Sequence, residues 1–261
     1  MKQLSPEKRF SEALLQIART QSLGTVFDDF LDFALLFIRW WDLKDEHFSD
    51  LEKKYPDKDL WRLFAEAYLA MADIADHNGA GFKDPFGDFY MEHLYQSATG
   101  QFFTPEPICD FMAHAQITAE MPDKATVYDP CCGSGRLLLS AGKINRLFTF
   151  YAADVDLTCC KMTVLNFLLN TMCGEVAWMD SLSLKYYRGW KTDKVMLDNG
   201  FYLPCYRVIT ADESELAMKS ASSVPPAKSA GTDTPLSETP VNTTTRRKPK
   251  PPTSQLILDF G

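Results

Sequence analysis

The fold is decided by the stretch TVYDPCCGSGR, residues 126–136. Val127 and Tyr128 predict a short buried strand, with Asp129 at its end. A Gly-Ser-Gly turn follows, and a helix is predicted to begin near Arg136. Glycine tolerates a positive φ and lets a ligand approach the backbone where a Cβ would block it. Because ligands of open α/β sheets bind at the carboxyl ends of the strands, this stretch predicts one wall of a ligand pocket.

The charge at the strand end limits the class of ligand. Gly133 and Gly135 match the first two glycines of a dinucleotide-binding fingerprint, but Leu138 stands where the third small residue is expected. Asp129 would repel a pyrophosphate and would attract a cationic ligand. An NAD-dependent oxidoreductase is therefore a minor alternative, which a finding of bound NAD would revive.

Three motifs stand in order along the chain, at Asp84–Tyr90, Gly100–Pro105 and Asp129–Gly135. The last reads Asp-Pro-Cys-Cys-Gly-Ser-Gly and is similar to the Asp-Pro-x-x-Gly-[Ser/Thr]-Gly motif of the N6-adenine DNA methylase family, the modification-subunit type of restriction–modification systems. The second resembles that family's Gly-x-x-x-Thr-Pro segment, which contacts S-adenosylmethionine, and the first resembles the segment before it. The resemblance covers residues 84–199 and implies adenine-N6 methylation of DNA with S-adenosylmethionine as cofactor.

The resemblance assigns cofactor-binding roles to these motifs and to two further strand ends. Asp154 follows a predicted second strand, where an acidic residue accepts hydrogen bonds from ribose hydroxyls. Asp156 is the weaker candidate, because it can cap the next helix. Asp180, in a Met-Asp-Ser-Leu sequence, matches the family's acidic residue for the cofactor adenine; the alternative is a strand-end Asp in a turn. The implied set is Phe103, Thr104, Pro105, Asp129, Cys131, Gly133, Ser134, Gly135, Asp154 and Asp180.

The catalytic motif of the family is degenerate here. The family has Asn/Asp-Pro-Pro-Tyr/Phe after its fourth strand, which we predict at Lys194–Leu197. In that motif, the Asn side chain and a proline-fixed carbonyl accept the two N–H bonds of the target adenine, and the aromatic ring stacks on the flipped base. This chain reads Asp-Asn-Gly-Phe at 198–201, which leaves Asn199 and Phe201 as candidate catalytic residues. Asn-Gly is also an ordinary turn sequence, and we favour the turn.

The chain predicts an α/β fold in four parts. Residues 1–79 are predicted as a helical region and 80–210 as an α/β domain with a partial, mainly parallel sheet, which the resemblance implies is a Rossmann-like class I methyltransferase domain. Residues 211–254 are predicted as a disordered linker and 255–261 as a peptide motif. Helices are predicted at Ser5–Thr20, Leu23–Trp41, Glu46–Tyr55, Leu60–His77, Pro85–Ser97, Pro105–Ala119, Arg136–Asn145 and Leu157–Cys173. Strands are predicted at Val127–Asp129, Phe148–Ala153, Glu175–Trp178, Lys194–Leu197 and Phe201–Thr210.

The terminal peptide carries apolar residues at the end of a polar tether. Its pattern, Gln-Leu-x-Leu-x-Phe, resembles the bacterial sliding-clamp-binding peptide. In that interpretation Leu256, Leu258 and Phe260 fill a pocket. Gln255 makes a polar contact. The same residues also suit a terminal strand that pairs with the exposed edge of the sheet, and the sequence favours neither interpretation.

The charge distribution argues against unaided DNA binding. The formal net charge is −8, and the tail from Ala217 onward holds six Lys/Arg against three Asp/Glu, so the body before the tail is more acidic still. Duplex affinity rests mainly on Lys and Arg side chains that meet phosphates. We therefore expect DNA to be bound through a partner such as a specificity subunit, or through a local basic patch.

Cysteine usage and hydropathy predict a cytoplasmic protein. The seven cysteines include two adjacent pairs but no Cys-x-x-Cys spacing, which argues against a zinc site and for a reducing compartment. The N-terminus shows no signal-peptide pattern. The apolar stretch Phe30–Trp41 contains Asp32 and Arg39, so it predicts a buried helix and no membrane span.

Two functions from different classes fit these observations. The first is a bacterial adenine-N6 DNA methyltransferase, an enzyme that transfers the methyl group of S-adenosylmethionine in line. The second is a catalytically inactive module that binds the cofactor, or nothing, and acts through partners such as a specificity subunit or the replication clamp. The ordered cofactor motifs favour the enzyme, whereas the missing Pro-Pro pair and the acidic body favour the binding module.

Overall fold

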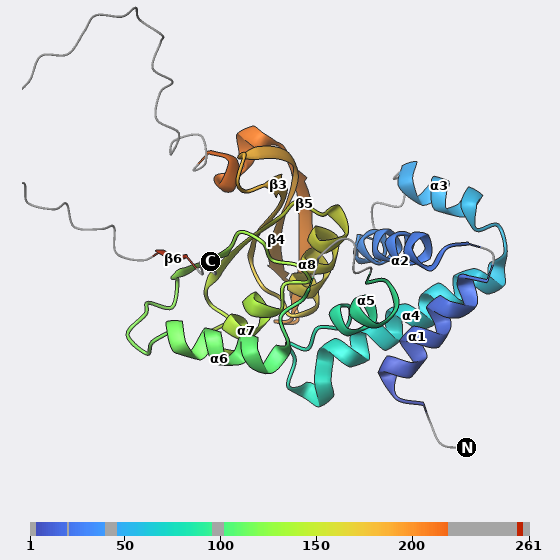
Figure 1. Ribbon diagram of the computed structural model, residues 1–261, viewed down its shortest axis with the longest axis horizontal. Coiled ribbons are helices and arrows are strands. Elements are labelled where there is room, and N and C mark those ends of the chain that lie inside the picture. The colour runs from blue at the N-terminus through green and yellow to red at the C-terminus, as the bar shows by residue number, and fades with distance from the viewer. Residues whose placement is uncertain (1–3, 20, 40–45, 96–101, 219–254, 258–261) are drawn as a thin grey trace, which may run out of the picture.

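The computed structural model describes residues 4–19, 21–39, 46–95, 102–218 and 255–257. A helical region at the N-terminus lies beside an α/β domain (Figure 1). The predicted fold class is confirmed, since parallel strands alternate with helices in the domain and a helical region precedes it. Within these ranges, no helix combines the length and the apolar character needed to cross a bilayer.

In the described part of the N-terminal region there are four α-helices. They are α1 (Pro6–Ile17), α2 (Leu23–Ile38), α3 (Glu46–Lys54) and α4 (Lys58–Asp76), followed by the short 3-10 helix η2 (His77–Gly79). Ser5 and Ser22 begin α1 and α2, because each side chain accepts a hydrogen bond from a backbone N–H of the first turn. The apolar faces of these helices meet, and Phe10 of α1 lies edge-on against Phe30 of α2 with ring centroids 5.3 Å apart.

The helical region shares its core with the α/β domain. Helix α5 (Gly87–His93) carries Phe89, whose ring centroid lies 5.2 Å from that of Phe10 and 5.4 Å from that of Phe27. Phe86, just before α5, is fully buried in the same cluster of apolar side chains. That cluster continues to the sheet. The boundary that we predicted at residue 79 therefore follows the last helix of the N-terminal region, and a single core continues across it.

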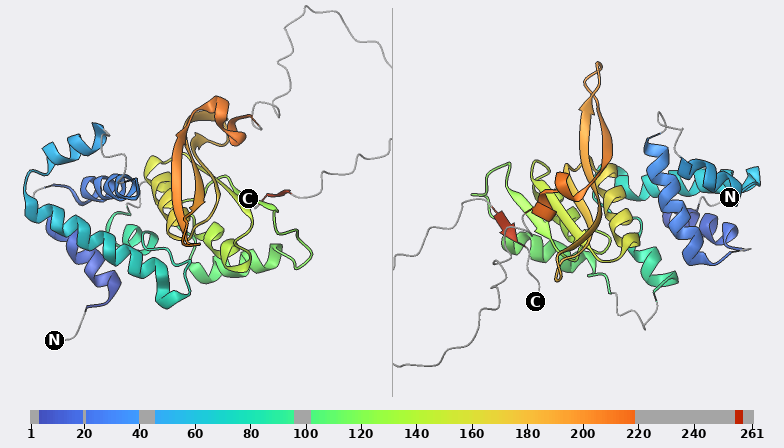
Figure 2. Two further views of the ribbon diagram at one scale, coloured as in Figure 1. Left: turned by 180° about the vertical axis from the view of Figure 1, so that it is seen from behind. Right: turned by 90° about the horizontal axis from the view of Figure 1, so that it is seen from above.

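Six strands form one sheet in the order β5-β4-β3-β2-β1-β6. The strands are β1 (Thr126–Asp129), β2 (Thr149–Asp154), β3 (Gly174–Asp180), β4 (Lys185–Met196), β5 (Tyr202–Ile209) and β6 (Gln255–Ile257). Strands β6, β1, β2 and β3 are parallel, whereas β4 is antiparallel to β3 and β5 to β4. Helices α7 (Arg136–Ile144) and α8 (Leu157–Leu169) connect the parallel strands, and α6 (Glu106–Gln116) precedes β1 (Figures 1 and 2).

The fourth strand differs from the prediction in length and direction. We predicted a strand at 194–197, whereas β4 already begins at Lys185. Only four residues separate Asp180 from Lys185, and a parallel crossover needs a dozen or more residues. The chain therefore turns back as a hairpin, with Leu184 at a positive φ of 60°. The predicted strand at 201–210 is confirmed as β5, the edge strand of this hairpin.

Residues 211–218, which we predicted as the start of a disordered linker, are packed against the sheet. The 3-10 helix η3 (Ala211–Glu213) and the residues up to Met218 pack on the face of the sheet opposite α8. Glu175 of β3 is buried and accepts hydrogen bonds from the Ser214 hydroxyl and from Glu215 N at 3.0 Å. Leu216 covers the apolar side chains of β2 and β3 on that face. The rest of the predicted linker, 219–254, lies outside the described residues.

The C-terminal strand β6 extends the sheet beside β1. Thr126, Val127 and Tyr128 pair in parallel register with Gln255, Leu256 and Ile257. Of the two interpretations of the terminal peptide, the structure has the strand at the sheet edge and gives no support to the clamp-binding peptide. Leu258 and Phe260 lie outside the described residues.

The start of β3 predicts a strong test of the sheet. A Cβ on Gly174 would lie 1.7 Å from the Phe150 carbonyl oxygen, so Gly174→Ala must force the two strands apart. We expect it to lower the free energy of unfolding by about 2 kcal/mol or more in urea denaturation.

The matched control is Gly24→Ala in the first turn of α2, where a Cβ meets nothing within 4 Å. Alanine at that helical position should leave stability unchanged or raise it by up to about 1 kcal/mol. Equal effects of the two substitutions would contradict the pairing of β3 with β2.

Candidate functional site

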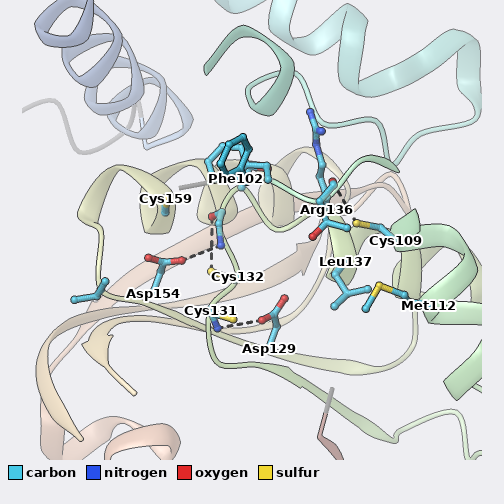
Figure 3. A pocket seen from close by; sticks show the side chains of 15 residues that line it. Phe102, Cys109, Met112, Asp129, Cys131, Cys132, Arg136, Leu137, Asp154 and Cys159 are labelled. Atoms are coloured by element: carbon cyan, nitrogen blue, oxygen red, sulfur yellow. Dashed lines mark hydrogen bonds between the residues drawn. The ribbon is translucent and has the colours of Figure 1, made fainter. Parts of the chain in front are cut away.

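A cavity of about 390 Å³ lies at the carboxyl ends of β1 and β2 (Figure 3). Its walls are the segment before α6, one face of α6, the β1–α7 turn and the β2–α8 turn. Most of the predicted cofactor residues line it: Phe103, Thr104, Asp129, Cys131, Gly133, Ser134 and Asp154. Pro105 and Gly135 stand at the N-caps of α6 and α7, just outside the lining.

The β1–α7 turn depends on two glycines. Gly133 has φ 54° and Gly135 has φ 87°, a region that L side chains rarely adopt. A Cβ on Gly133 would lie 2.9 Å from the Phe103 ring, and one on Gly135 would lie 3.1 Å from Thr163 of α8. Phe103 in turn stacks on Tyr90, with ring centroids 5.1 Å apart. The turn is therefore enclosed between an aromatic pair and α8, and its backbone is open to a ligand in the cavity.

Asp154 ties the end of β2 to this turn. Its Oδ2 accepts a hydrogen bond from Gly133 N at 2.9 Å, and its Oδ1 accepts one from Asp156 N at 2.9 Å. Burial raises the pKa of Asp154, and the backbone hydrogen bonds oppose that shift. Asp156 accepts from Thr158 N at 2.8 Å and so caps α8. Of the two candidates for ribose binding, Asp154 is the one that lines the cavity.

Asp129 is the second carboxylate of the cavity. It is 4% exposed, and its Oδ1 accepts a hydrogen bond from Cys131 N at 3.1 Å. Burial, together with the nearby Asp154 charge, raises the pKa of Asp129 to about 6. Asp129 and Asp154 extend from neighbouring strand ends toward the same cavity (Figure 3). A cationic ligand in the cavity would therefore stabilise both ionised carboxylates.

Arg136 is the cation of the cavity wall, but its charge is already matched. Its Nε donates to Asp84 at 2.7 Å and its guanidinium donates to Asp88 at 2.5 Å. Burial lowers the pKa of Arg136, and the two carboxylates outweigh that effect and leave it raised. Among the described residues that line the cavity, the uncompensated charges are therefore negative.

Helix α6 contributes an apolar wall that the motif analysis missed. Cys109 and Met112 stand three residues apart on α6 and both line the cavity. Burial raises the pKa of the Cys109 thiol to about 11, so the thiol is neutral at physiological pH. These two residues follow the Thr-Pro segment at a spacing that places them on one face of a helix. That spacing could have identified them from the sequence.

Asp180 lies at the carboxyl end of β3, the end of the sheet that carries the cavity, but it does not line the cavity. Its carboxylate accepts hydrogen bonds from Ser183 Oγ at 2.6 Å, Ser183 N at 3.1 Å and Leu182 N at 2.9 Å. These hydrogen bonds lower the pKa of Asp180. The residue therefore holds its own turn, which is the alternative that the sequence offered, and it is absent from the cavity lining.

Asn199 and Phe201 lie at the wrong end of the sheet for catalysis. Because Thr192 pairs with Gly174, the first residue of β3, and with Tyr206 of β5, residues 193–205 extend beyond the amino end of β3. The cavity lies at the opposite, carboxyl ends. Asn199 Oδ1 accepts from Phe201 N at 3.1 Å and closes the β4–β5 turn. The catalytic interpretation is wrong for the described structure, because the hairpin reverses the strand that should carry the motif.

Comparisons with known proteins point to one group. The sequence model of the family described as N-6 DNA Methylase matches residues 82–232, more than half of the chain. The methylase subunit of the type I restriction enzyme MpnII from Mycoplasma pneumoniae is 30% identical over 100 residues, which cover 34% of this chain and 18% of that protein. The solved type I restriction-modification system methyltransferase subunit from Streptococcus thermophilus is 17% identical, with 63% of this chain and 56% of that chain covered and a TM-score of 0.31.

The raised pKa of Asp129 predicts an unusual stability profile. With a folded-state pKa of about 6 and an unfolded value of about 3.9, the folded state binds the proton more tightly and loses stability as the pH rises from about 4 to 6. At pH 7.5, Asp129→Asn should therefore raise the free energy of unfolding by up to about 3 kcal/mol. The gain should shrink as the pH falls below 6, measured by urea denaturation across pH.

Asp180→Asn is the matched control. Its carboxylate has a lowered pKa because its turn stabilises the charged form, so this variant should lose stability at pH 7.5. A loss of stability in Asp129→Asn at pH 7.5 would show that the cavity does not destabilise the Asp129 charge.

Proposed function

Because the chain belongs to the N-6 DNA methylase family, we propose that its cavity binds S-adenosylmethionine for the methylation of DNA at adenine N6. The observation that carries the proposal is the pair of buried carboxylates, Asp129 and Asp154, beside the Gly133–Gly135 turn. The bound cofactor would supply an electrophilic methyl group on a sulfonium centre.

The charges, the hydrogen-bond acceptors and the size of the cavity support that cofactor. Asp154 accepts hydrogen bonds from the ribose hydroxyls in this proposal, as acidic residues at the second strand end do in nucleotide-binding sheets. Asp129, with Phe103 and Thr104, forms the methionine side, where the ligand carries positive charge. The cavity volume of about 390 Å³ lies in the range of small-molecule sites. Asp180 takes no part in this proposal, because it does not line the cavity.

The same charges argue against a dinucleotide. A pyrophosphate would meet two carboxylates, and Arg136 is held by Asp84 and Asp88. An NAD-dependent oxidoreductase is therefore not supported by the electrostatics of the cavity.

Groups that bind the target base must come from elsewhere. Asn199 and Phe201 lie at the end of the sheet opposite the cavity. The chain matches only 18% of the length of its Mycoplasma pneumoniae relative, which is a subunit by name. We propose that residues outside the described ranges or a partner polypeptide, such as a specificity subunit, complete the acceptor site and supply the DNA contacts. The net charge of −8 supports a partner, because phosphates must be met by cations.

We also propose that the protein works in the cytoplasm. Its seven cysteines all lie in the described residues and form no disulfide bond with one another, and thiols stay reduced in that compartment.

Isothermal titration calorimetry with S-adenosylmethionine tests the cofactor site. The unaltered protein should bind it, and Asp154→Asn should weaken binding by about tenfold, because a hydrogen bond to a charged group contributes about 1.5 kcal/mol or more. Asn199→Ala is the matched control and should leave the Kd unchanged within about twofold, since its turn lies at the other end of the sheet. If the protein binds NAD and does not bind S-adenosylmethionine, the proposed cofactor is wrong.

Methyl transfer is tested separately. The protein is incubated with methyl-labelled cofactor and DNA that lacks N6-methyladenine, first alone and then with a specificity subunit. Label on DNA only in the second case supports the partner-completed site. Cofactor binding without label in either case would favour a catalytically inactive binding module.

A further inference from the structure

We propose that Asp84, which lies outside the cavity, is a positioning residue that fixes the Gly133–Gly135 turn and offsets the charge of Arg136 in the cavity wall. The inference rests on the proposed binding of S-adenosylmethionine and extends it to a residue in the segment between the helical region and α5. Asp84 is absent from the cavity lining, so it acts through its neighbours.

Asp84 is a buried carboxylate surrounded by donors from three parts of the chain. It is 6% exposed. Its Oδ2 accepts from Ser134 Oγ at 2.6 Å and from Arg136 Nε at 2.7 Å. Its Oδ1 accepts from Asn166 Nδ2 of α8 at 3.0 Å. Its own loop adds the N–H groups of Phe86 and Gly87 at 3.0 and 3.1 Å. A buried charge is stable only when it is paired and hydrogen-bonded in this way.

These bonds hold the central residue of the glycine turn at two points. Ser134 donates its hydroxyl to Asp84, and its carbonyl accepts a hydrogen bond from Asn166 at 2.7 Å. Asn166 is fully buried and joins both partners. Ser134 lines the cavity. The carboxylate of Asp84 therefore sets the position of a backbone segment that the cofactor must approach.

The close approach of the two segments requires Gly87. A Cβ there would lie 2.3 Å from Asp84 Oδ2 and 2.6 Å from an Arg136 nitrogen. This explains the Asp-Pro-Phe-Gly-Asp sequence, which the cofactor contacts leave unexplained. The flanking Phe86 and Phe89 pack against Phe10 and Phe27, so the helical region holds Asp84 in place.

Asp84 also controls the charge of the cavity. Arg136 lines the cavity with a side chain that is 10% exposed, and Asp84 is its buried partner. The other partner, Asp88, is 76% exposed, and exposed ion pairs contribute little. Without the Asp84 carboxylate, only the exposed Asp88 would offset the guanidinium charge, which would then repel a cationic ligand in the cavity.

The test compares Asp84→Asn with Asp88→Asn. Titration calorimetry gives the Kd for S-adenosylmethionine at a temperature where circular dichroism shows each variant folded. Amide hydrogen exchange of the segment 131–137 is measured without ligand. We expect Asp84→Asn to raise the Kd by about tenfold or more and to speed exchange of the turn, because hydrogen bonds to a buried charge are lost. Asp88→Asn should change both by less than about threefold.

A purely structural role would lower the melting temperature of Asp84→Asn but leave the Kd and the exchange of the turn at their original values, and that result would overturn the proposal. If the unaltered protein binds no S-adenosylmethionine, the proposed function fails, while the exchange measurement still decides whether Asp84 fixes the turn. If Asp84→Asn does not fold, Ser134→Ala removes only the hydroxyl that reaches Asp84. Unchanged exchange of the turn in Ser134→Ala would then refute the positioning role.

Discussion

The turn from β1 into α7, in which Gly133 and Gly135 have positive φ, is held by hydrogen bonds to two buried carboxylates. Asp154 holds Gly133 N from the end of β2, and Asp84 holds Ser134 Oγ from the segment before α5. Glycine provides the positive φ at 133 and 135, but it does not select one conformation. The carboxylates do select one, and they join the sheet, α8 and the helical region at a single point. The shape of the cavity follows from that junction.

Burial of carboxylates also determines what the cavity can accept. Asp84 has a guanidinium partner, whereas burial raises the pKa of Asp129 and Asp154. Two buried carboxylates without a cationic partner make the fold less stable than apolar side chains would in their place. Such sites are common where a bound ligand supplies the missing charge. On the α6 wall, the neutral thiol of Cys109 and the side chain of Met112 add apolar surface without adding charge. The cavity is thus suited to a ligand that is apolar in part and positive in part.

Local patterns predicted most of the elements. Apolar spacing and capping residues located α1, α2, α7 and α8, and the strand–Asp–glycine order located the cavity, because these features depend on neighbours in sequence. The direction of β4 was missed, since it depends on the short distance from Asp180 to Lys185 and not on composition. Because of that reversal, Asn199 lies at the end of the sheet opposite the cavity. The role of Asp84 was out of reach, because its donors at 134, 136 and 166 are distant in sequence.

The central claim is that the strand-end carboxylates and the glycine turn enclose a positively charged nucleoside. A crystal structure of the protein grown with S-adenosylmethionine tests it most directly. The account predicts ligand density in the cavity at the ends of β1 and β2, with the ribose at Asp154 and the methionine portion near Asp129. Density at another surface of the protein, with the carboxylates of the cavity unchanged and in contact with water, would contradict it.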